Sequence, residues 1–206
     1  MDYKTIIPFG KVIGKDLFGI TAYSCYTKNP NLIRYGRFYI FGNILTGIKW
    51  ECVEFIRRWF IIRYSITFQE IENAYQIFNT NYLKFTNLIT GENISYTKYY
   101  NGSIGNLLPI VGSIIIWNKF GQHPYGHCAV VLHIDENYIY IAEQNWDNKK
   151  WENNYSRKIQ FNLGMLNSVS LIDQNKYNVP ILGWLTLDNL EKNIFYPQLN
   201  TRFNSL

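Results

Sequence analysis

The clearest pattern of apolar and polar positions lies in the second half of the chain, after Pro109. Runs of β-branched and aromatic residues alternate there with turn residues, which is typical of strands. We predict four strands from these runs, "GSIIIWNKF" (112–120), "GHCAVVLHI" (126–134), "YIYIAEQNW" (138–146) and "PILGWL" (180–185).

The first half of the chain has helical spacing instead. Residues 49–64 are predicted to form one helix and residues 67–80 a second, in which Thr67 and Glu70 have the spacing of a capping box. An apolar stripe follows at i, i+3, i+4 and i+7, formed by Ile71, Ala74, Tyr75 and Phe78. Turns and short strands are expected before residue 20, at Gly10, Gly14 and Gly19, and residues 81–110 are expected to be mostly irregular. Helices first and strands afterwards predict an α+β domain with an antiparallel sheet.

Composition and charge exclude several classes of protein. The chain has 206 residues, 47% hydrophobic and 17% charged, so a folded domain is expected rather than a disordered chain. The net charge of +5 permits an anionic partner. The basic residues are, however, scattered from Lys4 to Arg202 without a run, which indicates a solvated surface and no nucleic-acid partner.

Targeting signals and cysteine usage indicate the compartment. The opening "MDYKTIIPFG" lacks the apolar segment of a signal peptide, and no apolar run reaches the ~18 residues of a membrane span. Cys25, Cys52 and Cys128 are odd in number and far apart in sequence, which favours free thiols over a disulfide framework. We therefore expect a cytoplasmic protein with no membrane partner.

A hairpin over residues 126–146 supplies the first candidate chemistry. If its turn centres on Asp135, His127 and Glu143 lie directly opposite each other, with their Cβ atoms roughly 5 Å apart. An imidazole N–H could then donate to the carboxylate. The pairing depends on the register, because register decides which face each side chain takes.

Cys52 opens the predicted helix in "KWECVEFIRRW". A helix N-terminus favours the reactive thiolate, and its free N–H groups can hold the oxyanion of a tetrahedral intermediate. Together Cys52, His127 and Glu143 form a coherent set for nucleophilic catalysis of the papain type. The alternative is that Cys52 is a small buried residue of the core.

The other thiol and imidazole groups have structural interpretations. Cys128 lies on the strand face opposite His127, and His133 lies near the turn without an orienting acid. His123 and His127 are four residues apart, as metal ligands on a helix can be, but Pro124 opposes a helix there. No metal and no cofactor are expected.

At this point the sequence resembles a known family. The segments "KWECVEFIRRW", "GSIIIWNK", "GHCAVV", "IAEQNW" and "ILGWL" resemble the amidase domain of glutathionylspermidine and trypanothione synthetase-amidases, a CHAP-type, papain-like cysteine amidohydrolase. "FGKVIG" and "GITAYSC" resemble the opening of that domain. The resemblance implies a papain-like CHAP fold, with the nucleophile at a helix start packed on an antiparallel sheet. It also implies one domain over 1–206, with a core at about 9–185 and a polar tail at 186–206.

The resemblance assigns a role to each matching position. Cys52 would be the nucleophile, with its backbone N–H in the oxyanion hole; His127 would be the general base and acid, and Glu143 its orienting acid. Arg57 and Asn145 match positions that contact the substrate. The family often has Gln before the nucleophile where this chain has Glu51, whose charge would oppose a thiolate but could attract a polyamine.

The implied reaction is hydrolysis of the amide between glutathione and a polyamine, by a stand-alone amidase acting on a small-molecule conjugate. Two alternatives remain open. One is a CHAP amidase or endopeptidase that cleaves peptidoglycan, which the basic net charge favours. The other is an inactive binding module. The sequence leaves the oligomeric state undetermined.

Overall fold

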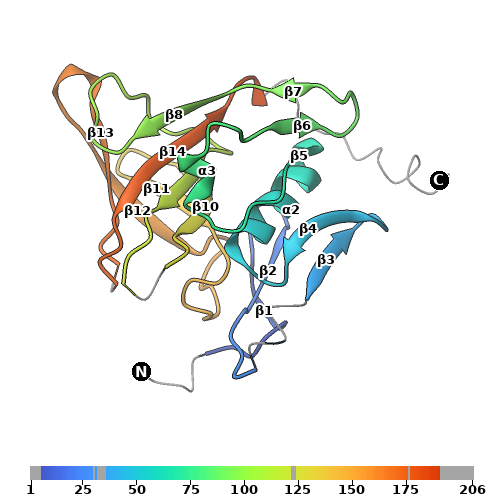
Figure 1. Cartoon of the computed structure of the whole chain (residues 1–206). Coiled ribbons are helices and arrows are strands. Elements are labelled where there is room, and N and C mark those ends of the chain that lie inside the picture. The colour runs from blue at the N-terminus through green and yellow to red at the C-terminus, as the bar shows by residue number, and fades with distance from the viewer. Residues whose placement is uncertain (1–5, 30, 32–35, 122–123, 176, 191–206) are drawn as a thin grey trace.

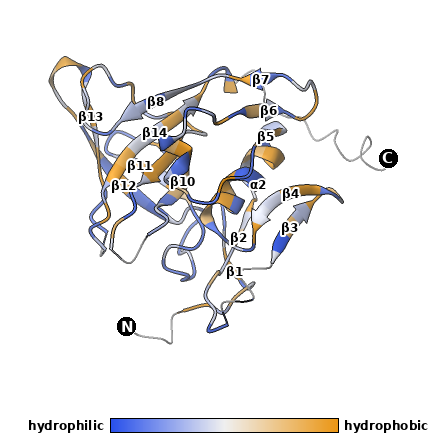
Figure 2. Ribbon diagram, in the orientation of Figure 1, coloured by the Kyte–Doolittle hydropathy of each residue, from blue (hydrophilic) through white to orange (hydrophobic). Residues whose placement is uncertain are grey.

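The helix α2, Cys52–Tyr64, lies at the centre of the molecule (Figure 1). This computed structural model describes residues 6–29, 31, 36–121, 124–175 and 177–190. The helix packs against β10, His127–Ile134, and also against β4, Ile44–Ile48, and β5, Ile66–Phe68. Polar and apolar residues alternate along its ribbon in Figure 2, although most of its side chains are buried. The predicted helix over 49–64 is confirmed, with its start at Cys52.

Seven strands in the described part of the chain form one antiparallel sheet, in the order β13–β12–β11–β10–β9–β14–β8. Besides β10, its strands are β8 (Tyr96–Tyr100), β9 (Ile114–Trp117), β11 (Tyr138–Ala142), β12 (Arg157–Leu163), β13 (Val169–Ile172) and β14 (Ile181–Leu187). The sheet is curled so that its two edge strands, β8 and β13, approach each other. Asn101, just after β8, exchanges hydrogen bonds of 2.7 and 3.0 Å with the backbone of Leu171 in β13. The four strands predicted from the apolar runs are all present, and the α+β class is confirmed.

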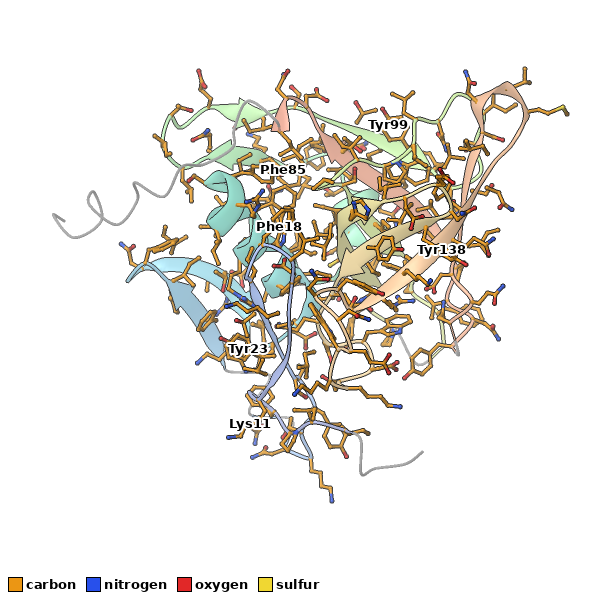
Figure 3. All side chains as sticks on the ribbon, turned by 180° about the vertical axis from the view of Figure 1, so that it is seen from behind. Lys11, Phe18, Tyr23, Phe85, Tyr99 and Tyr138 are labelled. Atoms are coloured by element: carbon orange, nitrogen blue, oxygen red, sulfur yellow. The ribbon has the colours of Figure 1, made fainter. Side chains whose placement is uncertain are left out.

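Alternation along the strands divides the apolar core into two clusters. The cluster on the α2 side contains Cys52 and Phe85 together with Cys128 and Val130 of β10. The cluster on the other face contains Ala129 and Val131 of β10 together with Trp117 and Trp184. In the reverse view of Figure 3, Phe85 lies beside α2, and Tyr99 and Tyr138 lie on the large sheet. Both faces of the sheet are therefore buried, which explains the nearly continuous apolar runs of its central strands.

The remaining elements are short. The further strands are β1 (Val12–Lys15) with β2 (Thr21–Tyr23), β3 (Arg37–Ile40) with β4, and β5 with β6 (Phe85–Asn87) and β7 (Asn93–Ile94). Among the described residues, the short helical segments include α3 (Gln76–Asn79) and the 3-10 helix η2 (Met165–Asn167). The short strands expected near the start are present as β1 and β2. Among the described residues, no helix combines the length and apolar character needed to cross a membrane.

The prediction of a helix over 67–80 is wrong for most of its length. The chain leaves α2 through Ser65 in the left-handed conformation, and Thr67 then pairs with Thr86 in a sheet. Glu70 forms an ion pair with Arg37 in place of a helix cap. The apolar stripe marked residues that pack, since Ala74 and Phe78 are buried, but only α3 is helical there.

Two boundaries also differ from expectation. Residues 81–110 are less irregular than predicted, because they contain β6, β7 and the sheet strand β8. The ordered core continues beyond residue 185, since Leu187 ends β14 and Leu190 is buried. The single-domain assignment stays a prediction, and residues 191–206 of the expected tail lie outside the described residues.

Candidate active site

Cys52 is the first residue of α2, and its side chain is buried between the helix and β10. A hydrogen bond with the Cys128 side chain lowers the pKa of the Cys52 thiol well below its usual range, and burial opposes this effect. A hydrogen bond with His127 and the charge of that imidazole lower the pKa further. The helix N-terminus acts in the same direction, because it favours negative charge. These contacts and the helix N-terminus all favour the thiolate form of the sulfur, against the effect of burial.

His127 is the first residue of β10 and is 2% exposed. Its Nε2 lies 2.9 Å from Oε2 of Glu143, so Nδ1 remains for the bond with Cys52. Burial opposes the charged imidazole, but the bond and charge of Cys52, followed by those of Glu143, raise the pKa of His127 to about 9. Trp117 and Trp146 lie against the ring, with centroids 5.4 and 4.6 Å away. The imidazole thus lies between a thiol and a carboxylate with its orientation fixed.

Glu143 reaches His127 in a register that differs from the predicted one. A turn centred on Asp135 would pair Val130 with Tyr140, whereas Val130 pairs with Ala142. The predicted direct opposition of His127 and Glu143 is therefore wrong by two residues. A shift of two keeps both side chains on the same face as diagonal neighbours, which long side chains can bridge. The hydrogen bond forms despite the shift.

Arg157, the first residue of β12, and Asp173, just after β13, complete the site and were not predicted from the sequence. Arg157 donates to both oxygens of Glu143, from Nε to Oε1 at 2.6 Å and from Nη2 to Oε2 at 3.1 Å. Its Nη1 donates to Oδ1 of Asp173 at 2.6 Å. Burial would raise the pKa of Glu143, but the charge of Arg157 and the bond from His127 lower it to about 2. Glu143 is therefore a carboxylate at any physiological pH.

Glu51 and Asn145, two predicted substrate-binding residues, contact each other, and Glu51 directly precedes Cys52. Asn145 Nδ2 donates to Glu51 Oε2 at 2.8 Å, and the Cys25 thiol lies 3.8 Å from Oε1. Burial and then the charge of Cys52 raise the pKa of Glu51 to about 7, against the hydrogen bond from Asn145. Glu51 consequently changes its charge near neutral pH at the edge of the site.

Arg57 lies elsewhere and has other partners. Its side chain is buried, and it donates to the backbone oxygens of Thr46, Phe68 and Gln69 at 2.7 to 3.0 Å. Its guanidinium carbon also lies 4.7 Å from the centre of the Phe68 ring. These contacts support a structural role that joins α2 to β4 and β5, and substrate binding by Arg57 stays an untested prediction.

A buried network attaches the start of α2 to the end of β11. Gln144, fully buried, donates to Glu51 O at 3.2 Å and to Glu54 Oε2 at 2.9 Å. Glu54 also pairs with Arg58, whose Nε lies 2.7 Å from Oε1. Because Gln144 lies between Glu143 and Asn145, the network fixes the distance between the carboxylate strand and the cysteine helix.

Cys128 and His133 have the structural positions that the sequence indicated. Cys128 is buried in the cluster on the α2 side, and burial raises the pKa of its thiol. His133 is exposed and contacts the Tyr140 ring. His123 lies outside the described residues. Within the described part of the chain, no three His, Cys, Asp or Glu side chains are grouped as metal ligands.

A pocket of about 430 Å³ opens on the Arg157 side of this arrangement. Glu143, Arg157, Ile13 and most of the segment 146–158 line it, and Cys52 and His127 do not. Of the three residues Cys52, His127 and Glu143, the pocket therefore reaches only Glu143, and the Cys52 sulfur lies away from it.

Comparison with protein families identifies the class. The CHAP domain family matches residues 43–145, half of the chain, a segment that includes Cys52, His127 and Glu143. The chain belongs to the CHAP domain family.

Known proteins of similar sequence include trypanothione synthetase of Crithidia fasciculata, 31% identical over 187 residues, or 90% of this chain and 28% of that protein. The bifunctional glutathionylspermidine synthetase/amidase of Escherichia coli is 27% identical over 184 residues, or 86% of this chain and 29% of that protein. Glutathionylspermidine synthase of Crithidia fasciculata is 30% identical over 143 residues, or 68% of this chain and 19% of that protein. The chain thus spans less than a third of the length of each of these relatives.

Proposed function

We propose that this chain is a cysteine amidohydrolase that cleaves the amide between a glutathione carboxyl group and a polyamine nitrogen. The observation that carries the proposal is the row of Cys52, His127 and Glu143, joined by hydrogen bonds from sulfur to imidazole to carboxylate. Similarity to a bifunctional glutathionylspermidine synthetase/amidase supports the choice of substrate.

The chemistry follows from the charges in the row. The Cys52 thiolate attacks the amide carbon, and the oxyanion that forms is stabilised by the backbone N–H of Cys52 at the helix start. Protonated His127 gives its proton to the leaving nitrogen, the C–N bond breaks, and a glutathionyl thioester remains on Cys52. A water molecule then transfers a proton to His127 and attacks the thioester, which releases glutathione and restores the thiolate–imidazolium pair.

Glu51 gives a reason for a cationic leaving group. It is half-buried beside Cys52, and its carboxylate can attract a polyamine ammonium close to the scissile bond. Asn145 would hold this carboxylate in place through the hydrogen bond to Oε2.

The alternative substrate is a peptidoglycan peptide, which the net charge of +5 favours. Wild type and Cys52→Ala would be incubated with glutathionylspermidine and, separately, with purified peptidoglycan, and the products identified by mass spectrometry. We expect glutathione and spermidine from wild type only. Release of peptidoglycan fragments instead would favour the alternative, and no product together with an unreactive Cys52 would indicate a binding module.

A further inference from the structure

Arg157 stands at the point where β12 meets the end of the β10–β11 hairpin, and it satisfies both oxygens of a buried carboxylate. Glu143 is 3% exposed, so water does not compensate its charge. Oε1 accepts from Arg157 Nε, and Oε2 accepts from Arg157 Nη2 and lies against His127 Nε2. This two-point contact fixes the plane of the carboxylate and leaves one direction of Oε2 for the imidazole.

Asp173 holds Arg157 from the opposite side. It accepts from Arg157 Nη1 at 2.6 Å through Oδ1 and from Trp117 Nε1 at 2.8 Å through Oδ2. The Trp117 and Trp146 rings lie 5.1 and 4.6 Å from the guanidinium carbon, and both rings also flank His127. One pair of indoles therefore encloses a row of alternating charges that runs from the imidazole to Asp173.

The pocket gives Arg157 a second effect. Glu143 and Arg157 both line it, but the Arg157 side chain is 21% exposed and the Glu143 side chain only 4%. The guanidinium thus separates the carboxylate from solvent. Without it, water in the pocket would reach Glu143 and compete for Oε2.

We propose that Arg157, anchored by Asp173, is a positioning residue that keeps Glu143 ionised, oriented and dry, and so stabilises the imidazolium–thiolate pair of His127 and Cys52. The inference rests on the proposed function, since it concerns the reactivity of the same cysteine. Arg157 does not touch the sulfur or the imidazole in any contact described above and acts through Glu143.

The test is the pH dependence of Cys52 alkylation by iodoacetamide in full-length wild type, Arg157→Gln, Arg157→Lys and Asp173→Asn. Lys158→Gln is the matched control, since Lys158 is the next residue of β12, is exposed, and lies over the Tyr138 ring. We expect the midpoint of the alkylation profile to rise by about one pH unit in Arg157→Gln, which is about a tenfold loss of thiolate below the midpoint. Arg157→Lys keeps the charge but loses the two-point contact with Glu143, and it should shift the midpoint less, as should Asp173→Asn. Lys158→Gln should leave the midpoint unchanged.

A purely structural role would lower the melting temperature without moving the profile, and a folded Arg157→Gln with the wild-type midpoint would overturn the inference. If Arg157→Gln does not fold, unchanged profiles in Arg157→Lys and Asp173→Asn would overturn it equally. A wild-type profile like that of an ordinary thiol would overturn the proposed function and this inference with it. A depressed wild-type midpoint that the variants do not shift would overturn the inference alone.

Discussion

Two buried glutamates of this protein are each paired with an arginine, but their surroundings differ. Glu54, inside α2, is bound by Arg58 one helical turn later, by Thr46 and by Gln144. Glu143, at the end of the hairpin, is bound by Arg157 and by His127. The partners of Glu54 hold elements together, whereas Glu143 has in His127 a partner that can give up and regain a proton.

The comparison shows that burial and pairing alone do not distinguish Glu54 from Glu143, for which we propose different roles. Both glutamates are nearly inaccessible, and both have every oxygen satisfied. The difference lies in what the partner contacts next. His127, the partner of Glu143, also forms a hydrogen bond with Cys52.

The largest expected effect is on stability, in Glu54→Ala. Removal of the carboxylate leaves Arg58 buried and unpaired, which costs about 3–5 kcal/mol of unfolding free energy. The alkylation profile of Cys52 in the folded fraction should keep its midpoint. Urea unfolding measures the loss, and Glu70→Ala, at an exposed ion pair with Arg37, is the control with a small effect. A marginal effect of Glu54→Ala would contradict the structural role.

The next effect is on turnover, in Glu143→Gln. The amide keeps the shape and still accepts from His127, but the imidazolium loses its charge partner. We expect kcat to fall about 100-fold with little change in KM, since general acid–base groups contribute about 10²–10⁴-fold. Steady-state kinetics provide the measurement, and unchanged turnover would remove Glu143 from the catalytic set.

The pH dependence of wild-type turnover should show the raised pKa of His127. The imidazolium persists until the pH rises through about 9, and above it the proton for the leaving nitrogen is lost. Turnover should therefore decline on the alkaline side near pH 9. On the acid side, Glu143 stays ionised down to pH of about 2, so its titration sets no limit above that pH. A decline centred near pH 6.5, where an unperturbed imidazole titrates, would contradict the thiolate–imidazolium pair.

The smallest effect is expected in Glu51→Gln. The pKa of about 7 means that Glu51 gains its charge as the pH rises through neutrality. KM for a polyamine conjugate should fall a few-fold, about 2–5-fold, between pH 6 and 8 in wild type, as for a partly exposed ion pair. Glu51→Gln should show a flat KM over that range. The same pH dependence in both proteins would separate Glu51 from substrate binding.

Sequence alone predicted the central helix, the hairpin and the contact between His127 and Glu143. The contact was predictable despite the wrong register because a two-residue shift leaves side chains on the same face. Arg157 was missed, although the alternation of buried Ile159 and Phe161 with exposed neighbours would have indicated β12. The approach of Arg157 to Glu143 depends on strand register, which local pattern does not contain.

The helix predicted over 67–80 does not form, which shows how a local pattern can predict an element that the fold excludes. Its capping pattern was locally consistent, but the pairing of Thr67 with Thr86 and the bonds from Arg57 to the carbonyls of Phe68 and Gln69 hold that backbone extended. Tertiary contacts of this kind override helix propensity. They join residues far apart in sequence, so the local pattern gave no sign of them.

The most direct test of the central claim compares the three cysteines in one sample. Wild-type protein is treated briefly with limiting iodoacetamide at pH 6, and each cysteine is quantified by peptide mass mapping. At this pH an ordinary thiol is almost fully protonated and reacts slowly. We expect alkylation of Cys52 first, with Cys25 and Cys128 nearly unlabelled, because burial raises the pKa of both other thiols. Labelling of Cys25 or Cys128 ahead of Cys52, or equally slow labelling of all three, would contradict it.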